Sequence, residues 1–288
     1  PCVDRIRPGR PGQLFRRMGE SLSVLRGRMP TLSDAELAAV GEDSRRGARA
    51  LWAREVKRRD KVAAEAARLE RMLTHERELW NDGLSVAGVD EVGAGPLAGP
   101  VMAAAVVLPM HVSFDGIDDS KQLDRVAREA LAEEIRNRAL AWSVGECSRA
   151  EIDQMNIYRA SHEAMRRAVV GLAVTPDVLL VDARTVPGVS QPQRALIKGD
   201  SQSQAIAAAS IVAKVTRDAW MRKAAERYPG YGFESHKGYY CPQHLDALER
   251  LGPCTLHRRS FSPVAAVCSE SQLAAFHAER EAYRCTDG

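Results

Sequence analysis

Residues 88–100 read GVDEVGAGPLAGP, and this stretch decides how the rest of the chain is interpreted. Two acids, Asp90 and Glu91, close an apolar run and are followed by Gly93, Gly95 and Gly99. Buried carboxylates are costly unless their charge is compensated, and glycines weaken regular structure. A chain that carries both features side by side points to a functional site at this place.

Apolar runs on either side of the stretch predict a sheet. Five segments read as strands, at residues 85–90, 101–109, 139–147, 177–183 and 194–200. Helical patterns lie between and after them, at 122–138, 156–172, 202–227 and about 242–251. Strands that alternate with helices predict an α/β domain whose sheet is covered by helices.

Two further acids follow predicted strands: Asp182 in LLVDA and Asp200 in LIKGD. A single aspartate there is commonly a helix cap, but functional groups of α/β sheets gather at the carboxyl ends of strands. Four carboxylates brought together need cations, and oxygen ligands alone select Mg²⁺ or Mn²⁺. The pattern therefore favours a site for two-metal phosphoryl transfer.

The glycines do not form a nucleotide-binding motif. The stretch from Gly93 to Gly99 is neither GxGxxG nor a Walker motif, and it favours a loop whose N–H groups approach a phosphate or sugar. The absence of GxSxG disfavours a Ser-His-Asp hydrolase.

Composition limits the class of protein. The 288 residues are 45% hydrophobic, enough for a core, and no apolar stretch reaches the roughly 18 residues of a membrane helix. Six scattered cysteines suggest reduced thiols. We expect a cytoplasmic monomer without membrane contact.

Charge is uneven along the chain. Residues 1–80 carry 18 Lys and Arg against 12 Asp and Glu, whereas residues 81–288 carry 23 against 26. A basic arm suits contact with nucleic-acid phosphates, and a solvated, charge-rich helix is the open alternative. Ser33 and Glu36 have the spacing of a capping box, and Met29 is a candidate natural start that would place 1–28 outside the native protein.

Changes in composition and periodicity divide the chain into five parts. We predict a disordered leader at 1–30, a basic helical extension at 31–82 and an α/β domain at 83–227. A loop-rich substrate-binding subdomain at 228–267 and a flexible tail at 268–288 follow.

Seven segments in order resemble one family, ribonuclease HII, over about residues 84–265. They are GVDEVGAGPLAGPV, DDSKQL, EIDQMNIYRAS, LLVDA, IKGDSQSQAIAAASIVAKVTRD, YGFESHKGY and HRRSFSPV. The resemblance implies a ribonuclease H-like fold: a mixed five-stranded sheet flanked by helices, a C-terminal helical subdomain and, in one branch, an N-terminal helical extension.

The resemblance also implies an activity. Such enzymes cut the RNA strand of RNA–DNA hybrids and the 5′ side of single ribonucleotides in duplex DNA. The products carry a 3′-hydroxyl and a 5′-phosphate, the cofactor is Mn²⁺ or Mg²⁺, and the role is ribonucleotide removal in DNA repair.

Site residues carry over position by position. The catalytic, metal-binding acids would be Asp90, Glu91, Asp182 and Asp200. The substrate-binding residues would be Gly93, Ala94 and Gly95 at the ribose 2′-hydroxyl, Tyr239 on the neighbouring sugar, and Lys121, Ser210 and Lys214 at phosphates or in support of the site.

The chain departs from the family pattern at several positions. Ala94 replaces the arginine of a Gly-Arg-Gly loop, while Asp118 and Gln122 replace an expected asparagine and lysine. We expect a working but weakened enzyme. A hybrid-binding protein with disabled chemistry, or a nuclease of the same fold that cuts all-DNA substrates, are the alternatives.

A second departure creates the pattern CxxH…CxxH. Its members are Cys241, His244, Cys254 and His257. Zinc ligation is a hypothesis here, although the resemblance accounts for both histidines without a metal.

Overall fold

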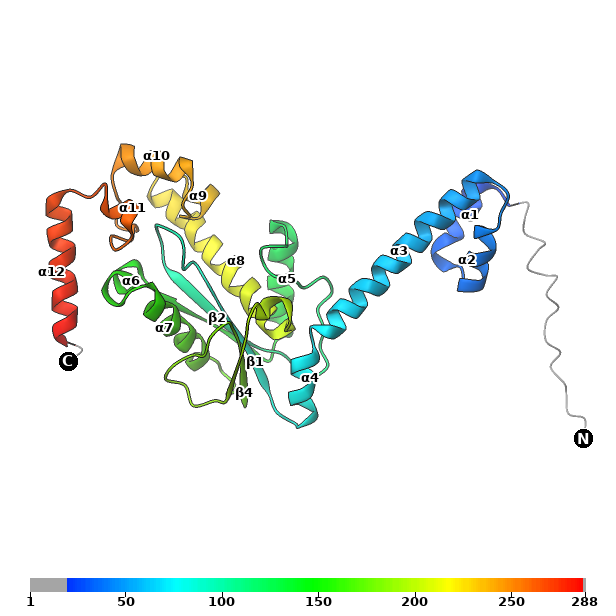
Figure 1. Cartoon of the computed structure of the whole chain (residues 1–288), viewed down its shortest axis with the longest axis horizontal. Helices are drawn as coiled ribbons and strands as arrows, with labels where there is room; N and C mark the ends of the chain where they lie inside the picture. The colour runs from blue at the N-terminus through cyan, green and yellow to red at the C-terminus, as the bar shows by residue number, and fades with distance from the viewer. Residues whose placement is uncertain (1–19, 287–288) are drawn as a thin grey trace, which may run out of the picture. The chain divides into compact units, whose positions relative to one another are not determined.

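The computed structural model describes residues 20–286, apart from the side chains of residues 282–286 (Figure 1). The chain divides between Arg68 and Leu69 into two compact units. We call residues 20–68 the helical unit and residues 69–286 the sheet unit, and describe each by itself.

The helical unit consists of short helices packed on the start of a long one. Its elements are α1 (Leu22–Arg28), the 3₁₀ helix η2 (Met29–Thr31), α2 (Asp34–Gly41) and α3 (Arg46–Arg71), of which all but the last residues belong to this unit. The capping box predicted at Ser33 and Glu36 is confirmed at the start of α2. Its core comprises Leu25, Met29, Leu32, Leu37 and Ala48.

The prediction of a disordered leader over 1–30 is wrong for residues 20–30; residues 1–19 lie outside the described part. Ser21 caps α1 through the Val24 N–H, and Leu25 and Met29 are buried. Burial of these two apolar side chains stabilises the segment, although its Arg and Gly content is typical of disorder.

The boundary between the units also differs from the predicted division at 82/83. Leu69, Met72 and Leu73 pack into the core of the sheet unit, as do Leu79 and Trp80 in and near α4 (Thr74–Asn81). The predicted helical stretch therefore contributes its residues from Leu69 onward to the sheet unit, because the apolar side chains there pack into the core of that unit.

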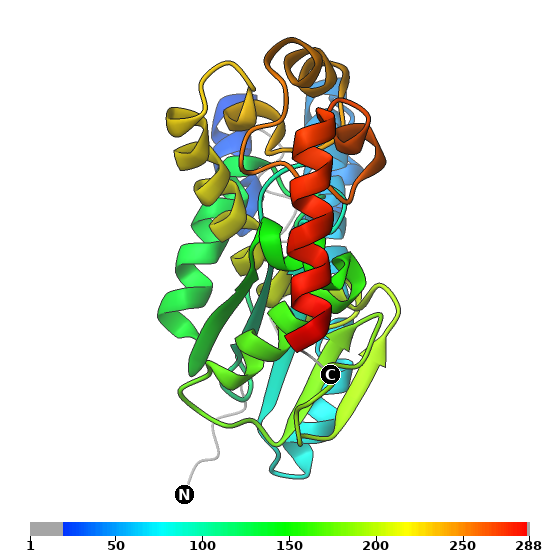
Figure 2. The ribbon, with the colours of Figure 1, turned by 90° about the vertical axis from the view of Figure 1, so that its left-hand side faces the viewer.

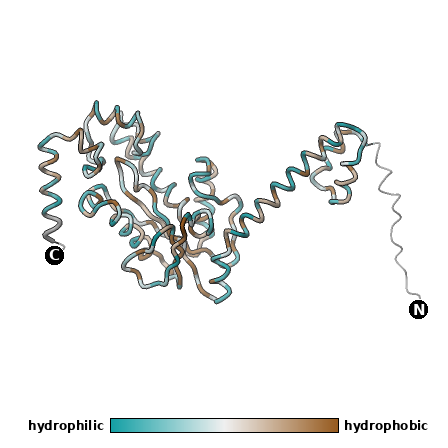
Figure 3. Tube along the Cα trace, viewed as in Figure 1, coloured by the Kyte–Doolittle hydropathy of each residue, from teal (hydrophilic) through white to brown (hydrophobic). Residues whose placement is uncertain are grey.

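The sheet unit contains the five predicted strands. They are β1 (Val86–Val92), β2 (Val101–Val107), β3 (Ala141–Cys147), β4 (Val178–Asp182) and β5 (Gln193–Leu196). Their order is β3-β2-β1-β4-β5, with β2 antiparallel to both neighbours and the pairs β1–β4 and β4–β5 parallel. The sheet is mixed, as predicted, and its strands are the most hydrophobic part of the trace (Figure 3).

Helices cover both faces of the sheet (Figures 1 and 2). One face packs on α5 (Arg125–Arg138) and α8 (Gln204–Arg227), and the other on α7 (Ile157–Val170). Close approach of α8 requires glycine at 88, since a Cβ there would lie 2.0 Å from the backbone carbon of Ala205. The sequence did not predict α6 (Arg149–Met155), a short capped helix before α7.

Four helices follow α8 in the described C-terminal segments. They are α9 (Phe233–His236), the predicted α10 (Pro242–Leu251), α11 (Ser262–Ala265) and α12 (Glu270–Thr286). The segment expected as a flexible tail is thus helical as far as Thr286, with Phe276 buried. Among residues 20–286, no helix is both long and apolar enough to cross a membrane.

Candidate metal and nucleic-acid site

The sheet brings the predicted acids to one edge. Asp90 and Glu91 lie in β1, and Asp182 ends the parallel neighbour β4, one residue beyond the pair Val89–Val181. Asp200 lies in the 3₁₀ helix η3 (Gly199–Ser201), shortly after β5 rather than at its last residue. Strand ends therefore position three acids, and a turn positions the fourth.

The turn is fixed to the end of β4 by a hydrogen bond. The N–H of Gly199 donates to Oδ1 of Asp182 at 2.7 Å. Ala183 and Lys198 on either side of this contact both have left-handed backbones, with φ of 56° and 57°. Such conformations are uncommon outside glycine and collect at functional sites. The bond and the two turns hold Asp200 beside Asp182.

The acids act on each other electrostatically. Asp90 is only 6% exposed, and burial raises its pKa well above the usual range, with the charges of Glu91, Asp182 and Asp200 adding to the rise. A hydrogen bond from Ser210 opposes it. Burial also raises the pKa of Glu91 and of Asp200. The site therefore holds more negative charge than its surroundings neutralise.

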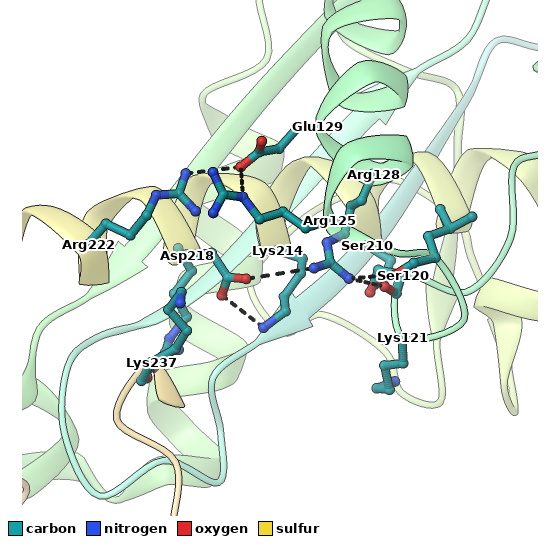
Figure 4. Close-up of polar contacts among 12 residues, drawn as sticks. Ser120, Lys121, Arg125, Arg128, Glu129, Ser210, Lys214, Asp218, Arg222 and Lys237 are labelled. Atoms are coloured by element: carbon teal, nitrogen blue, oxygen red, sulfur yellow. Dashed lines mark hydrogen bonds and ion pairs between the residues drawn. The ribbon is translucent and has the colours of Figure 1, made fainter. Parts of the chain in front are cut away.

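Lys121 is the cation nearest to Asp200. Its Nζ lies 3.8 Å from Oδ2 of Asp200 and 3.6 Å from Oδ1 of Asp119, and its side chain is 76% exposed. Ser120 and Ser210 share a hydrogen bond of 3.0 Å beside it, and Figure 4 shows all three residues. An exposed lysine offsets little buried charge, and Arg184 lowers the pKa of Glu91, yet the pKa values of Asp90, Glu91 and Asp200 remain raised.

This donor set fits divalent metal ions. Carboxylate oxygens are ligands that Mg²⁺ and Mn²⁺ prefer, and a cation would offset both the burial of the Asp90 charge and its repulsion by the neighbouring acids. In the described part of the chain, no three Asp, Glu, His or Cys side chains are already arranged around a point where an ion could sit. The four acids lie near one another, but their side chains do not surround a common point.

Lys214 and Tyr239 meet where α8 adjoins the C-terminal helices. The Nζ of Lys214 lies 2.8 Å from Oδ1 of Asp218 and 5.4 Å from the centre of the Tyr239 ring, which is 38% exposed as a residue. Figure 4 shows Lys214 and Asp218 in a network with Arg128. The tyrosine thus presents a partly open ring that a cation holds in place.

Two buried arginines donate hydrogen bonds to the backbone carbonyls of the glycine stretch and of neighbouring residues. Arg258 donates to the carbonyl oxygens of Gly93, Ala94 and Gly99, at 2.6, 2.9 and 3.0 Å. Arg217 donates to the carbonyls of Ala98, Pro100 and Lys237. Both guanidinium side chains are fully buried.

The backbone of this loop is shaped by its contact with Arg217. Gly93 has a φ of 89°, and a Cβ at that position would lie 2.2 Å from Nε of Arg217. Ala94 is partly exposed and Gly95 is exposed, with nothing near its missing side chain. The carbonyls of Gly93 and Ala94 are thus engaged by buried guanidinium, and the exposed side of the loop faces solvent.

Sequence analysis missed Arg217 and Arg258. Burial lowers the pKa of both, for Arg258 to about 9. HRRSFSPV was recognised as a motif, but no local pattern tells a buried arginine from an exposed one. Asp153 was not predicted either. Its carboxylate accepts hydrogen bonds from the N–H groups of Arg259 and Ser260, which fixes the segment directly after Arg258.

Zinc binding at the CxxH…CxxH pattern stays a hypothesis, to which the structure adds no support. Nε2 of His244 lies 3.1 Å from Nε2 of His257, and Nδ1 of His257 accepts from the N–H of Cys254. Among residues 20–286, Cys241 and Cys254 do not join the histidines in a metal-binding group. The imidazole of His244 also supports Tyr239, whose carbonyl lies 3.0 Å from its Nδ1.

Comparison with known proteins places these features in a family. A family model described as Ribonuclease HII matches residues 87–264, and one described as Ribonuclease HII N-terminal domain matches residues 27–80. The chain is 54% identical over 230 residues to a ribonuclease HII of Myxococcus xanthus, covering 79% of this chain and 78% of that protein. It is 51% identical over 233 residues to one of Geobacillus thermodenitrificans, covering 81% and 90%.

A solved structure shares the fold of the sheet unit. The ribonuclease H2 of Pyrococcus horikoshii aligns with a TM-score of 0.53 at 26% identity, covering 70% of this chain and 99% of that one.

Proposed function

The chain belongs to the ribonuclease HII family and is a metal-dependent ribonuclease H, and we propose that it cuts 5′ to single ribonucleotides embedded in duplex DNA as well as within RNA–DNA hybrids. The products would carry a 3′-hydroxyl and a 5′-phosphate, and the role would be ribonucleotide removal from DNA. One observation carries this proposal: four carboxylates gather at one end of the sheet strands, with the pKa of Asp90, Glu91 and Asp200 raised mainly by burial, and Asp90 and Glu91 directly precede a loop whose carbonyls are bound by buried Arg258.

Asp90, Glu91 and Asp182 would hold the divalent ion, Mn²⁺ or Mg²⁺, and Asp200 would complete the site when substrate is present. When bound, such ions activate water and stabilise the leaving oxygen of a phosphodiester. Asp90 is held for this purpose by Ser210, and Asp182 by the N–H of Gly199.

Recognition of the ribonucleotide would depend on the loop backbone. A 2′-hydroxyl is both donor and acceptor, so main-chain groups of Gly93, Ala94 and Gly95 can distinguish RNA from DNA. Arg258 binds the carbonyls of Gly93 and Ala94 from the buried side, which fixes the loop. Ala94 has no cationic side chain to add, so we expect weaker binding at this position.

The remaining predicted residues would support the phosphates and sugar. Tyr239 would stack on the neighbouring sugar with its ring fixed by Lys214. Lys121 would approach a phosphate from its exposed position beside Asp200, and Ser210 would act through its bond to Asp90.

One assay tests the proposal. Three duplexes are compared with Mn²⁺, with Mg²⁺ and with EDTA: one with a single ribonucleotide, an all-DNA control and a continuous hybrid. We expect cutting of the first and third only, and only with metal. Cutting of the all-DNA duplex would indicate another nuclease of this fold, and binding of the hybrid without cutting would indicate a binding protein.

A further inference from the structure

The outer face of α3 in the helical unit carries a row of cations. Four of its side chains are positively charged and exposed: Arg46, Arg54, Lys57 and Lys61. Within residues 20–286 none of the four forms an ion pair with a carboxylate. We call these four residues the α3 stripe.

Helical geometry places the stripe on one side. At about 100° per residue the four positions fall within a sector of roughly 80°, and they extend over about 22 Å of the helix axis. The opposite side of α3 packs on the unit's own core through Ala48, Trp52 and Val56. The stripe therefore points away from everything that the helical unit itself packs against.

Three arginines of the helical unit outside the stripe pair with acids, unlike the four stripe residues, while the exposed Arg49 donates to backbone carbonyls. Arg45 pairs with Asp43 at 2.6 Å, and Arg58 pairs with Glu55 at 2.6 Å. Arg59 bonds Asp34 at 2.8 Å. Acids thus balance the arginines at the packed side, whereas the stripe keeps a net positive charge for a partner.

The surface between the cations narrows the class of partner. Ala50, Ala53 and Ala64 lie within or beside the same sector, and all three are exposed. A membrane-binding helix needs large apolar residues, and protein interfaces are anchored by aromatic side chains. Small residues between long cations suit a uniformly charged backbone that approaches closely.

We propose that the α3 stripe is a docking surface for the phosphate backbone of nucleic-acid duplex. This inference rests on the proposed function, because a ribonucleotide-directed nuclease must hold long duplexes regardless of sequence. Duplex DNA carries one negative charge per about 1.7 Å, so a row of about 22 Å can face several phosphates. The stripe supplies affinity without sequence preference and offsets the cation that Ala94 does not provide.

The test replaces the charges in the full-length chain. In one variant Arg46, Arg54, Lys57 and Lys61 all become glutamine, which keeps helix propensity. In the matched control the charges stay, through Arg46→Lys, Arg54→Lys, Lys57→Arg and Lys61→Arg. Binding to a continuous RNA–DNA hybrid is measured in EDTA between about 50 and 200 mM KCl. The thermal midpoint of each variant shows that it is folded.

The glutamine variant should bind at least about tenfold more weakly at the lowest salt. The slope of log affinity against log salt should become shallower by up to about 3.6, which is 0.9 for each lost contact. The control should bind like the original chain. Unchanged affinity and slope in the glutamine variant would overturn the proposal, as would equal losses in both variants.

The result is separable from that of the proposed function. If the original chain cuts no ribonucleotide-containing duplex but the slope changes as expected, the stripe stands and the proposed function fails. If the original chain cuts as proposed but the slope is unchanged in the glutamine variant, the proposed function stands and the inference about the stripe fails. Binding of phosphatidylserine vesicles that the glutamine substitutions abolish, without any effect on duplex binding, would also overturn this inference.

Discussion

The guanidinium group of Arg258 lies behind Gly93 and donates a hydrogen bond of 2.6 Å to its carbonyl oxygen. The two residues are far apart in sequence, and the arginine is fully buried without a carboxylate partner among the described residues. The loop thus uses a buried cation to fix the direction of its carbonyls, and this relationship leads to the first prediction.

Arg258→Met should destabilise the protein and the loop together. It removes the Arg258 donor from three carbonyls, of which those of Gly93 and Gly99 are buried, at about 1–3 kcal/mol for an unsatisfied buried group. We expect a lower unfolding midpoint and a reduced preference for a single ribonucleotide over an all-DNA duplex. Arg259→Met, at the partly exposed neighbour, is the control. Equal effects of both substitutions would refute the role assigned to Arg258.

Ala94→Arg should strengthen recognition. A charged side chain on the partly exposed position can add roughly 1–3 kcal/mol of contact, or about five- to 150-fold in kcat/KM at a lone ribonucleotide. Ala94→Gln is the uncharged control of similar length and should gain much less. Steady-state kinetics on the single-ribonucleotide duplex measures the effect, and an unchanged rate in Ala94→Arg would contradict it.

Asp90→Asn should separate stability from activity. A raised pKa in the folded state means that the stabilising effect of this group is lost as pH rises through that pKa. Above the ordinary pKa of an aspartate, this raised pKa destabilises the metal-free protein, so the amide should raise its unfolding midpoint at about pH 8 in EDTA. Turnover should fall about 10³-fold or more. A variant that is both active and less stable would contradict this account.

Metal binding should be visible without turnover. An ion that binds only the folded state stabilises it by about 2.7 kcal/mol at a hundred times its Kd. We therefore expect Mn²⁺ or Mg²⁺ to raise the thermal midpoint of the original chain and not that of an Asp90→Asn, Asp182→Asn double variant. An equal rise in both proteins would place the metal elsewhere.

The histidine pair should make the fold sensitive to acid. Burial lowers the pKa of His257 to about 3 and also lowers the pKa of His244. The unfolded chain takes up protons on both rings near pH 6.5, so stability is complete above that value and falls as pH decreases. The loss should approach about 1.4 kcal/mol per pH unit for a fully linked group.

Urea unfolding at several pH values measures this dependence. His257→Asn, which cannot titrate, should show a flatter profile between about pH 6 and pH 4.5. Identical slopes for the variant and the original chain would show that carboxylates alone cause the acid sensitivity.

The strands and the four acids could be predicted from the sequence because both are local patterns. An apolar run followed by Asp182 shows a strand and its end without knowledge of the fold. The position of Asp200 was less exact, since a left-handed turn at Lys198 moves it beyond the strand. Local patterns gave the existence of the site and missed the turn that completes it.

The supporting residues could not be predicted in the same way. Arg217 lies in a helix among charged neighbours, and only the packing of α8 against the glycine loop buries it. The order of residues 20–30 likewise depends on Leu25 meeting Ala48, a contact between segments distant in sequence. The burial of Arg217 and the order of residues 20–30 both depend on tertiary packing, which cannot be predicted from the periodicity of the sequence.

Mapping the cut on an end-labelled duplex with one ribonucleotide tests the central claim most directly. The account predicts a metal-dependent nick immediately 5′ to the ribonucleotide, with a 3′-hydroxyl and a 5′-phosphate, that Asp90→Asn abolishes. A nick at another position, a nick in the all-DNA strand, or one that persists in EDTA or in Asp90→Asn would contradict it.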